Sequence, residues 1–353
     1  MLRDTSLRAP IGVYLETTYN CNLRCFHCYS DSGSTGTELS TQYIRSVLDE
    51  LREAGVFMLH FGGGEPLMRR DIFDLLRYSS QYFETSLVTN GTLVTKDKAK
   101  LLRDLNVKVG VSLDGPVAVH DRIRGVEGTF RRTIRGITCL VNEGISTGII
   151  ACVSKFNFHL LWKIVEISVD IGANSLKFTR FMPIGRGARH TNADLSPYSY
   201  KKLMSTIRAM QERYEDRMEI QVDENLQGLF CAATGGESGT KCSAARTTCT
   251  ITADGHLKPC PALVSFTSKD SLLSKSFSEI WSGAIELRRI RELSSDKIAF
   301  CKDCTFLHLC GGCCRAASWE RYGELHKPDP ACWFKHPKTL NQFFTKRENV
   351  ACC

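Results

Sequence analysis

The sequence has no uninterrupted run of about 18 apolar residues, so it predicts no transmembrane helix. Its N-terminal segment also lacks the long apolar stretch and the cleavage-like site of a secretory signal. Lysine and arginine give a formal net charge of +8, but aromatic residues are not interleaved with them as in nucleic-acid-binding platforms. These absences predict a cytoplasmic protein that binds neither a membrane nor nucleic acid.

Cysteine, by contrast, is abundant. The 353 residues include 17 cysteines, three of them between positions 21 and 28 and twelve from Cys231 onward. A secreted protein with disulfide bonds would explain such a number. The missing signal peptide, a hydrophobic content of 42% and the cysteine spacings instead favour reduced thiolates that bind iron or zinc.

Residues 11 to about 225 alternate between short apolar, β-branched runs and amphipathic stretches. Residues 40–55 illustrate the second kind, because four apolar side chains share one helical face and Gly55 stops the helix. Strands are expected at six places, namely 11–17, 56–61, 85–89, 107–113, 147–153 and 175–180. Six consecutive β–α units predict an α/β fold, a partial (β/α)6 barrel that is more open than a closed eight-stranded one.

The composition changes near residue 226, where Gly, Ser, Thr and Cys become frequent. We therefore expect a barrel domain over residues 8–225 and a cysteine-rich domain over residues 226–353. The second domain should contain short strands, a helix within residues 277–293 and cysteine-dense loops.

Three cysteines follow the first expected strand in the spacing C-x3-C-x2-C: Cys21, Cys25 and Cys28. Zinc would require a fourth ligand, and none follows in a familiar spacing. A [4Fe–4S] cluster held by three cysteines leaves one iron free for an external ligand. The spacing therefore favours an open iron–sulfur site.

This motif, placed after the first strand of a βα series, resembles the signature of the radical S-adenosylmethionine (SAM) superfamily. The resemblance implies that the free iron binds the amino and carboxylate groups of SAM. It also implies that one electron from the cluster cleaves the S–C5′ bond and yields a 5′-deoxyadenosyl radical. His27, before the third cysteine, would lie near the adenine, with a loop histidine of no function as the alternative.

Further segments agree with the resemblance in order and position. "HFGGGEPL" follows the second strand, and its Gly63, Gly64 and Glu65 match the motif that contacts the SAM amino group. "VSLDGPVAVHDRIRG" follows the fourth strand and would bring three residues to SAM. Ser112 and Asp114 would lie near the ribose and Arg124 near the carboxylate.

The C-terminal domain resembles the SPASM domain, which extends many radical SAM enzymes that act on peptides. The resemblance implies two auxiliary [4Fe–4S] clusters beside the SAM-binding one, with a zinc ribbon as the alternative. The first auxiliary cluster would be held by Cys242, Cys249, Cys260 and Cys314, and the second by Cys301, Cys304, Cys310 and Cys332. Spacing favours Cys314 over its neighbour Cys313, while Cys231, Cys352 and Cys353 are left without an assigned ligand role.

Three arginines lie at or after the end of the sixth strand: Arg180, Arg186 and Arg189. Because strand ends line the active mouth of a βα barrel, these side chains could clamp substrate carboxylates. A basic surface loop is the alternative.

The leading interpretation is a radical SAM oxidoreductase that abstracts a hydrogen atom from a ribosomally made peptide, giving a cross-link, an epimerisation or another oxidation. The alternatives are oxidation of tetrapyrrole propionates in haem or haem d1 synthesis and, ranked lower, an iron–sulfur electron-transfer protein. An electron donor such as a flavodoxin or ferredoxin is expected as a partner. Since the first strand begins near residue 11, either a separate protein holds the peptide's leader or the substrate has none.

Overall fold

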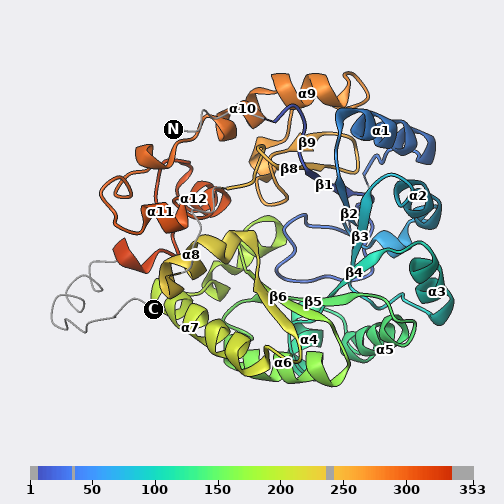
Figure 1. The fold of residues 1–353 in the computed structure, drawn as a ribbon, viewed down its shortest axis with the longest axis horizontal. Coiled ribbons are helices and arrows are strands. Elements are labelled where there is room, and N and C mark those ends of the chain that lie inside the picture. The colour runs from blue at the N-terminus through green and yellow to red at the C-terminus, as the bar shows by residue number, and fades with distance from the viewer. Residues whose placement is uncertain (1–6, 34–35, 236–241, 336–353) are drawn as a thin grey trace.

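A computed structural model describes residues 7–33, 36–235 and 242–335 of the chain. Parallel strands form a curved inner wall, and helices cover its outer face (Figure 1). The strands of the barrel are β1 (Gly12–Glu16), β2 (Met58–Gly62), β3 (Glu84–Thr89), β4 (Lys108–Ser112), β5 (Thr147–Val153), β6 (Ser175–Arg180) and β7 (Glu219–Val222). The helices of this part are α1 (Thr41–Ala54), α2 (Ile72–Ser79), α3 (Lys96–Asp104), α4 (Val117–Arg124), α5 (Thr129–Asn142), α6 (Leu161–Asp170) and α7 (Pro197–Tyr214).

The six expected strands are confirmed as β1 to β6, each paired in parallel with the next. A seventh strand, β7, pairs in parallel with β6 and was not predicted from the sequence. It has only four residues, "EIQV", which is too short for a clear periodic pattern. The sheet order is β7-β6-β5-β4-β3-β2-β1-β8-β9, so the sheet has two edges and the barrel is open, as expected.

Helix α1 illustrates how local sequence builds the outer layer. The Ser40 side chain accepts a hydrogen bond from the Tyr43 N–H at the start of the helix, and Gly55 ends it with a φ of 85°. Its apolar face is buried, contributed by Ile44, Val47, Leu48 and Leu51. The predicted helix at 40–55 is therefore confirmed within one residue at each end.

The C-terminal part continues the barrel sheet. Strand β8 (Thr248–Ile251) pairs in parallel with β1, and β9 (Leu257–Lys258) pairs antiparallel with β8. The other elements of this part are α8 (Glu224–Thr234), α9 (Phe277–Gly283), α10 (Ile285–Arg291), α11 (Leu307–Cys310) and α12 (Arg315–Tyr322). The expected domain boundary at 225 falls inside α8 and stays a prediction.

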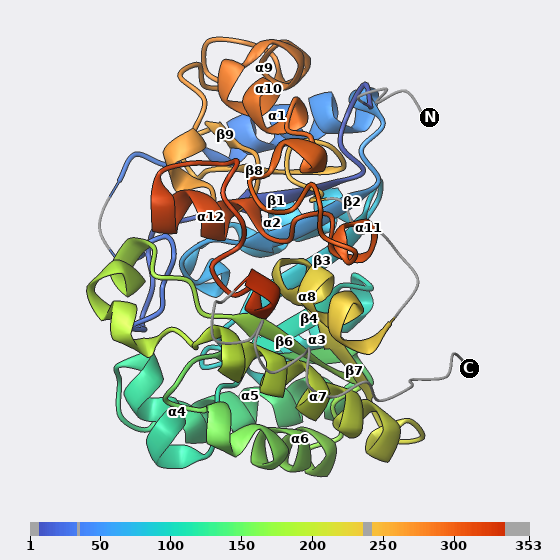
Figure 2. The same cartoon turned by 90° about the vertical axis from the view of Figure 1, so that its left-hand side faces the viewer.

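Further contacts join the two parts. Helix α9 lies beside α1 in both views (Figures 1 and 2). The Tyr43 hydroxyl donates to the Leu272 carbonyl, and the Leu39 N–H donates to the Ala253 carbonyl at 2.8 Å. Within the described ranges, no helix has both the length and the apolar character needed to cross a membrane.

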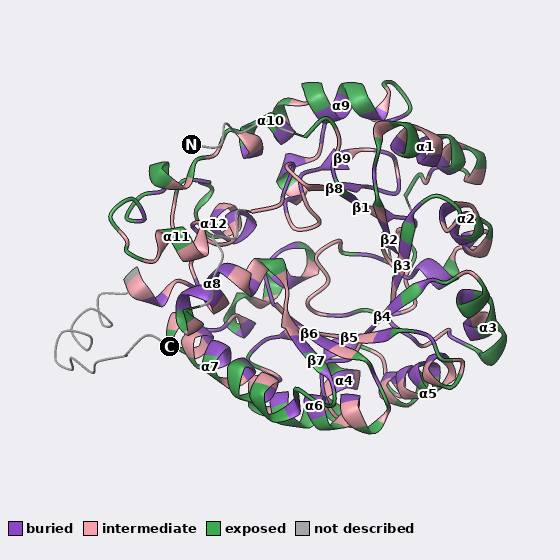
Figure 3. Cartoon of the chain, in the orientation of Figure 1, coloured by how far each residue is buried: buried purple, intermediate pink, exposed green. Residues whose placement is uncertain are grey.

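The interior of the barrel differs from its outer layer. Strand residues that face the helices, such as Val13 and Leu59, are buried and apolar, whereas the inward-facing Tyr14 and His60 are partly exposed. Figure 3 shows buried and partly exposed stretches along the strands. Among the inward residues, Tyr14 stacks on His60 with ring centroids 4.7 Å apart, and His60 Nδ1 lies 2.6 Å from the Ser86 hydroxyl. The open barrel thus encloses polar groups, which a substrate or cofactor can meet.

Candidate functional site

The three motif cysteines lie on the loop that follows β1. Backbone hydrogen bonds from Arg24 N–H to the Arg124 carbonyl and from Phe26 N–H to the Ile123 carbonyl, both 3.1 Å, fix this loop against the end of α4. Cys25 is buried, while Cys21 and Cys28 are half-buried. We call residues 17–33 the cluster loop.

Each thiol of the cluster loop has a hydrogen-bond donor beside it. The Leu23 N–H donates to Cys21 Sγ and the Ser32 N–H to Cys28 Sγ, each at 3.4 Å. Arg124 Nη1 lies 3.8 Å from Cys25 Sγ. Burial raises the pKa of Cys21 to about 11, and it also raises the pKa of Cys25 despite the opposing Arg124 charge. Cys21 and Cys25 are therefore protonated without metal, and metal binding releases their protons.

The three motif cysteines influence one another electrostatically. The charges of Cys25 and Cys28 both act on Cys21, so the three thiols share one electrostatic environment. In the parts of the chain that the structure describes, no three His, Cys, Asp or Glu side chains are arranged to hold one metal ion. A four-iron cluster is a larger body, and its ligating sulfur atoms stand further apart than those around one ion.

The glycine motif after β2 packs directly on the cluster loop. The Gly64 N–H donates to the Thr18 carbonyl and the Glu65 N–H to the Asn20 carbonyl, both at 2.8 Å. Gly63 has a φ of +114°, and a Cβ there would lie 2.7 Å from the Thr18 oxygen. At Gly64 a Cβ would collide with the Asn20 carbonyl. Only glycine permits this close approach of the two backbones.

Glu65 is fully buried and holds the turn between β2 and the end of β3. Its carboxylate accepts hydrogen bonds from the Leu67 N–H at 3.1 Å, the Thr89 hydroxyl at 2.7 Å and the Asn90 N–H at 2.8 Å. Burial raises the pKa of Glu65, and these donors oppose that rise. The side chain thus positions the glycine motif, whose contact with the SAM amino group stays a prediction.

The predicted SAM residues Asp114 and Arg124 meet beside Cys25. Arg124 Nη2 lies 2.7 Å from Asp114 Oδ2, and the Cys152 N–H donates to Asp114 Oδ1 at 2.9 Å. Burial would raise the pKa of Asp114, but the Arg124 charge outweighs it and holds the pKa below its ordinary value. Arg124 therefore links the carboxylate after β4 to the thiol of Cys25.

Two other predicted SAM residues lie nearby. Ser112 ends β4, half-buried, opposite Ile150 of β5. His27 makes an edge-to-face contact with Phe26, and burial lowers its pKa to about 4. A neutral imidazole is thus available near the cluster loop, as an adenine neighbour would be, and its role stays a prediction.

Arg180 and Arg186 bind groups of the protein itself, which differs from the expectation that they clamp substrate carboxylates. Arg180 is buried at the end of β6, and its Nη1 lies 3.0 Å from both carboxylate oxygens of Asp329. Arg186 donates to the carbonyls of Cys25 at 3.0 Å and Ser32 at 2.6 Å. Arg189 lies on the same segment with an exposed side chain, and its role stays a prediction.

The C-terminal cysteines divide into two groups. Backbone pairing of Ala245 with Pro259 at 3.0 Å brings the segments of Cys242 and Cys260 together. Burial raises the pKa of the Cys260 thiol, and the charges of Cys242 and Cys314 raise it further. We call Cys242, Cys260 and Cys314 the first auxiliary group.

Cys313 and Cys314 interact with different cysteines. Cys313 interacts with Cys310 and Cys332, whereas Cys314 interacts with Cys242. A hydrogen bond with Cys310 raises the pKa of Cys313 and lowers that of Cys310 to about 6, so the Cys313 thiol is the donor. The charge of Cys332 also acts on Cys313. These contacts support Cys314 as the member of the first auxiliary group, as the spacing predicts.

Cys249 does not join the first auxiliary group, which corrects its expected role. It lies opposite Val13 in the β1–β8 pair, fully buried in the apolar core. Burial raises the pKa of its thiol, and the Arg291 charge is the influence that opposes this rise. The thiol thus faces the outer helices rather than Cys242 and Cys260.

Comparison with known proteins identifies the family. The radical SAM superfamily model matches residues 15–167, and the SPASM iron–sulfur cluster-binding domain model matches residues 242–305. Mycofactocin maturase MftC of Mycolicibacterium smegmatis is 33% identical over 341 residues, which cover 93% of this chain and 84% of the relative. The chain belongs to the radical SAM superfamily.

Other proteins similar to this radical SAM enzyme cover at least 94% of its chain. The AdoMet-dependent heme synthase of Methanosarcina barkeri is 30% identical over 348 residues, 94% of this chain and 98% of the relative. The structure of Streptococcus suis SuiB bound to precursor peptide SuiA has a TM-score of 0.77 at 17% identity and covers 94% of this chain and 77% of SuiB. Native anSMEcpe with bound AdoMet has a TM-score of 0.73 at 20% identity, over 95% and 96% of the two chains.

These findings confirm the expected fold, a partial radical SAM barrel with a C-terminal SPASM domain. They also confirm that the protein is an enzyme, with SAM and iron–sulfur clusters as its cofactors.

A cavity of about 370 Å³ in the radical SAM enzyme lies between the cluster loop and the β8–β9 hairpin. Its walls include Glu16 of β1, Asp31 of the cluster loop, Asp254 of the hairpin turn and Lys258 of β9. Lys258 Nζ lies 2.8 Å from Glu16 Oε1, and both side chains are almost fully buried. We call this space the mouth cavity, and it joins the loop of Cys28 to the strand that precedes Cys260.

The contacts of Arg186 predict that its replacement lowers SAM cleavage both with and without substrate. In Arg186→Ala the cluster loop loses its bonds at Cys25 and Ser32, and the ion pair with Asp31 at 3.0 Å. Because bonds to a charged group are worth about 1.5–3 kcal/mol each, we expect both substrate-free and substrate-coupled SAM cleavage to fall at least about tenfold. The measurement is 5′-deoxyadenosine formed with and without substrate.

Arg189→Ala is the matched control, because it removes an exposed arginine from the same segment. It should leave substrate-free cleavage at the level of the unmodified enzyme. Normal substrate-free cleavage by Arg186→Ala would show that these bonds do not support the cluster loop.

Proposed function

We propose that this radical SAM enzyme abstracts a hydrogen atom from a ribosomally made peptide and leaves a cross-link, an epimerised centre or another oxidised product. When bound, the cluster and SAM supply one electron and a carbon-centred radical that removes the hydrogen atom. Cys21, Cys25 and Cys28 would hold the cluster. Arg124, Asp114 and Arg186 keep the cluster loop in place beside the substrate space.

The charge of the mouth cavity is the observation that favours a peptide over a tetrapyrrole as the substrate. Its lining residues include three carboxylates and one ammonium group, and that ammonium group is already paired with Glu16. A tetrapyrrole with several propionates would bring further negative charge into this space, at a cost in electrostatic energy. A neutral or basic peptide segment would not meet this repulsion.

The relatives support both substrate classes. A mycofactocin maturase is 33% identical and an AdoMet-dependent heme synthase 30% identical over similar lengths. The tetrapyrrole hypothesis relied on arginines at the barrel mouth to bind propionates. Since Arg180 pairs with Asp329 and Arg186 binds the cluster loop, two of those three arginines are committed to the protein. Because these two side chains already bind protein groups, a peptide substrate is favoured over a tetrapyrrole.

The two substrate classes can be separated in one assay. The reconstituted enzyme receives SAM and a reductant, together with either a short peptide encoded by a neighbouring gene or an iron porphyrin with propionate side chains. We expect the peptide to lose two hydrogens or to take up deuterium from the solvent, as read by mass spectrometry. Porphyrin that loses carbon dioxide beside an unchanged peptide would establish the tetrapyrrole reaction instead. The Cys21, Cys25 and Cys28 triple alanine variant is the control and should convert neither.

We further propose three [4Fe–4S] clusters, one on the cluster loop and two in the SPASM domain. Anaerobic reconstitution should then give about twelve irons per chain, measured by a colorimetric iron assay against protein concentration. About four irons, with the C-terminal cysteines titrating as thiols, would contradict the auxiliary clusters. The proposal includes a cytoplasmic setting, a flavodoxin or ferredoxin as electron donor, and a separate protein for any leader segment.

A further inference from the structure

The direction of Cys249 follows from strand pairing. In the parallel β1–β8 pair, Val13 lies opposite Cys249 and Tyr14 opposite Thr250. Side chains alternate along a strand, so Cys249 shares the outer face of Val13, and Thr250 shares the inner face of Tyr14. Val13 and Cys249 are both fully buried in the apolar core. The first auxiliary group therefore has three cysteines on the inner side and no contribution from Cys249.

Cys231 is the remaining described cysteine near this region, and it lies on α8. Three residues earlier, a Cβ on Gly228 would lie 2.7 Å from the Cys310 carbonyl and 3.3 Å from Cys313 Sγ. Residues three apart share a helix face, so Cys231 lies on the side of α8 that faces Cys310 and Cys313. Its thiol accepts a hydrogen bond from Gln227 Nε2 at 3.4 Å. Cys352 and Cys353 lie outside the described residues.

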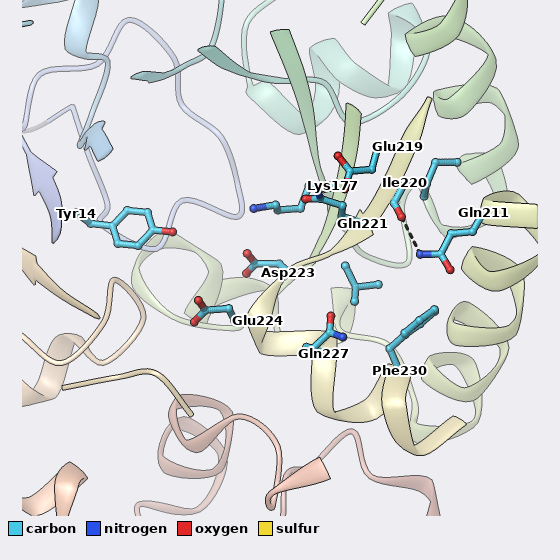
Figure 4. Close-up of a pocket in the computed structure, with 11 residues that line it drawn as sticks. Tyr14, Lys177, Gln211, Glu219, Ile220, Gln221, Asp223, Glu224, Gln227 and Phe230 are labelled. Carbon is cyan, nitrogen blue, oxygen red and sulfur yellow. Dashed lines mark hydrogen bonds between the residues drawn. The ribbon is translucent and has the colours of Figure 1, made fainter. Parts of the chain in front are cut away.

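A second cavity has Glu224 of α8 in its wall. It has a volume of about 350 Å³ and lies between β1 and the β6–β7–α8 segment. We call it the seam cavity. Figure 4 shows the Tyr14 hydroxyl and the Lys177 ammonium pointing toward each other across it, with the Asp223 and Glu224 carboxylates below them. The space is polar and has room for a small ligand.

One contact connects the seam cavity to the segment of the auxiliary cysteines. The hydroxyl of Ser243, the neighbour of Cys242, donates to the Glu224 carboxylate. Cys242 is thus connected to the cavity wall through its neighbour Ser243 and Glu224.

We propose that the first auxiliary cluster is held by three cysteines, Cys242, Cys260 and Cys314, and that its fourth iron is open to the seam cavity. Such an iron binds a small donor ligand in the same way that a site with three cysteines on the cluster loop does. The enzyme then has two places where an external ligand reaches iron, one at each side of the barrel interior. This inference does not depend on the identity of the substrate.

The test uses the full chain with Cys21, Cys25 and Cys28 replaced by alanine, so that no open iron of the SAM cluster is present. After anaerobic reconstitution this variant should contain about eight irons. Carbon-13 cyanide is added to the dithionite-reduced protein, and electron–nuclear double resonance is recorded. We expect a carbon-13 hyperfine coupling from cyanide bound to the auxiliary cluster, and no coupling would overturn the proposal.

Substitutions at Cys249 test the ligand set in the same background. Cys249→Val suits a buried strand position, and Cys249→Ser keeps the size of the side chain in case valine is not accommodated. Both should keep about eight irons and the cyanide coupling. Loss of about four irons from correctly folded protein in either variant would make Cys249 a ligand.

Two more variants exclude a hidden fourth cysteine. Cys231→Ala and the pair Cys352→Ala with Cys353→Ala should leave the cyanide coupling unchanged. A coupling that appears only after one of these substitutions would identify the replaced cysteine as the fourth ligand and overturn the proposal. Circular dichroism of each variant shows whether the fold is kept.

Discussion

Replacing Cys21, Cys25 and Cys28 together by alanine is expected to abolish reductive SAM cleavage while the C-terminal clusters remain. All three thiols belong to the cluster loop, and the auxiliary cysteines lie on other segments of the chain. The variant should form no 5′-deoxyadenosine above background, measured by liquid chromatography after addition of SAM and dithionite. Its iron content should fall by about a third, because one of three clusters is lost.

The control for this prediction is Cys139→Ala, which removes a half-buried thiol on α5 outside every assigned ligand set. It should keep full iron content and full SAM cleavage. Continued 5′-deoxyadenosine formation by the triple variant would mean that the SAM-binding cluster is held elsewhere.

Asp329→Ala is expected to produce the largest loss of stability, because it breaks a buried ion pair. Arg180 and Asp329 have side chains that are 1% and 0% exposed, and Arg180 would keep a buried charge without its partner. Removal of one partner from a buried ion pair lowers the free energy of unfolding by about 3–5 kcal/mol. The Cys314 N–H, which donates to Asp329 at 3.0 Å, also loses its acceptor, so iron of the first auxiliary cluster should fall as well. Urea denaturation followed by fluorescence measures the free energy of unfolding, and an iron assay measures the cluster.

Two control variants test whether the loss of stability in Asp329→Ala comes from the unpaired buried charge. Lys163→Ala breaks an exposed ion pair with Glu166 and should change the free energy of unfolding by no more than about 1 kcal/mol. The double substitution Arg180→Met with Asp329→Leu removes both charges and should recover a large part of the lost stability. An Asp329→Ala variant as stable as Lys163→Ala would show that the pair does not hold the barrel to the C-terminal domain.

The sequence predicted the barrel strands and the order of the cluster, glycine and aspartate motifs, because these depend on short-range patterns. It could not predict the partners of the arginines. Asp329 is 149 positions from Arg180, and nothing local marks the pair. Arg186 binds backbone carbonyls of Cys25 and Ser32, which every residue type possesses. Long-range partners of this kind appear only when the fold is known.

Cysteine spacing favours Cys314 as a ligand, and this stays a prediction. The sequence also assigned Cys249 to the same cluster, but the structure places its side chain on the outer face of the sheet. Spacing along the chain does not say which face of a strand a side chain occupies. Cys249 lies in β8, where a shift by one residue exchanges the inner and outer faces. Only the register with Val13 of β1 decides that its thiol points outward.

The pairing of β1 with β8 also has a consequence for how the chain folds as it is made. The ribosome releases β1 early, yet its partner on this edge, Thr248–Ile251, emerges only after the rest of the barrel. Until then, the nascent chain exposes unpaired N–H and C=O groups along β1, and such an edge readily pairs with another chain. The β1 edge is thus covered only after residues 248–251 have been made, so this pairing forms late in synthesis. Chains interrupted before residue 248 should collect in aggregates, whereas longer chains cover the β1 edge with β8.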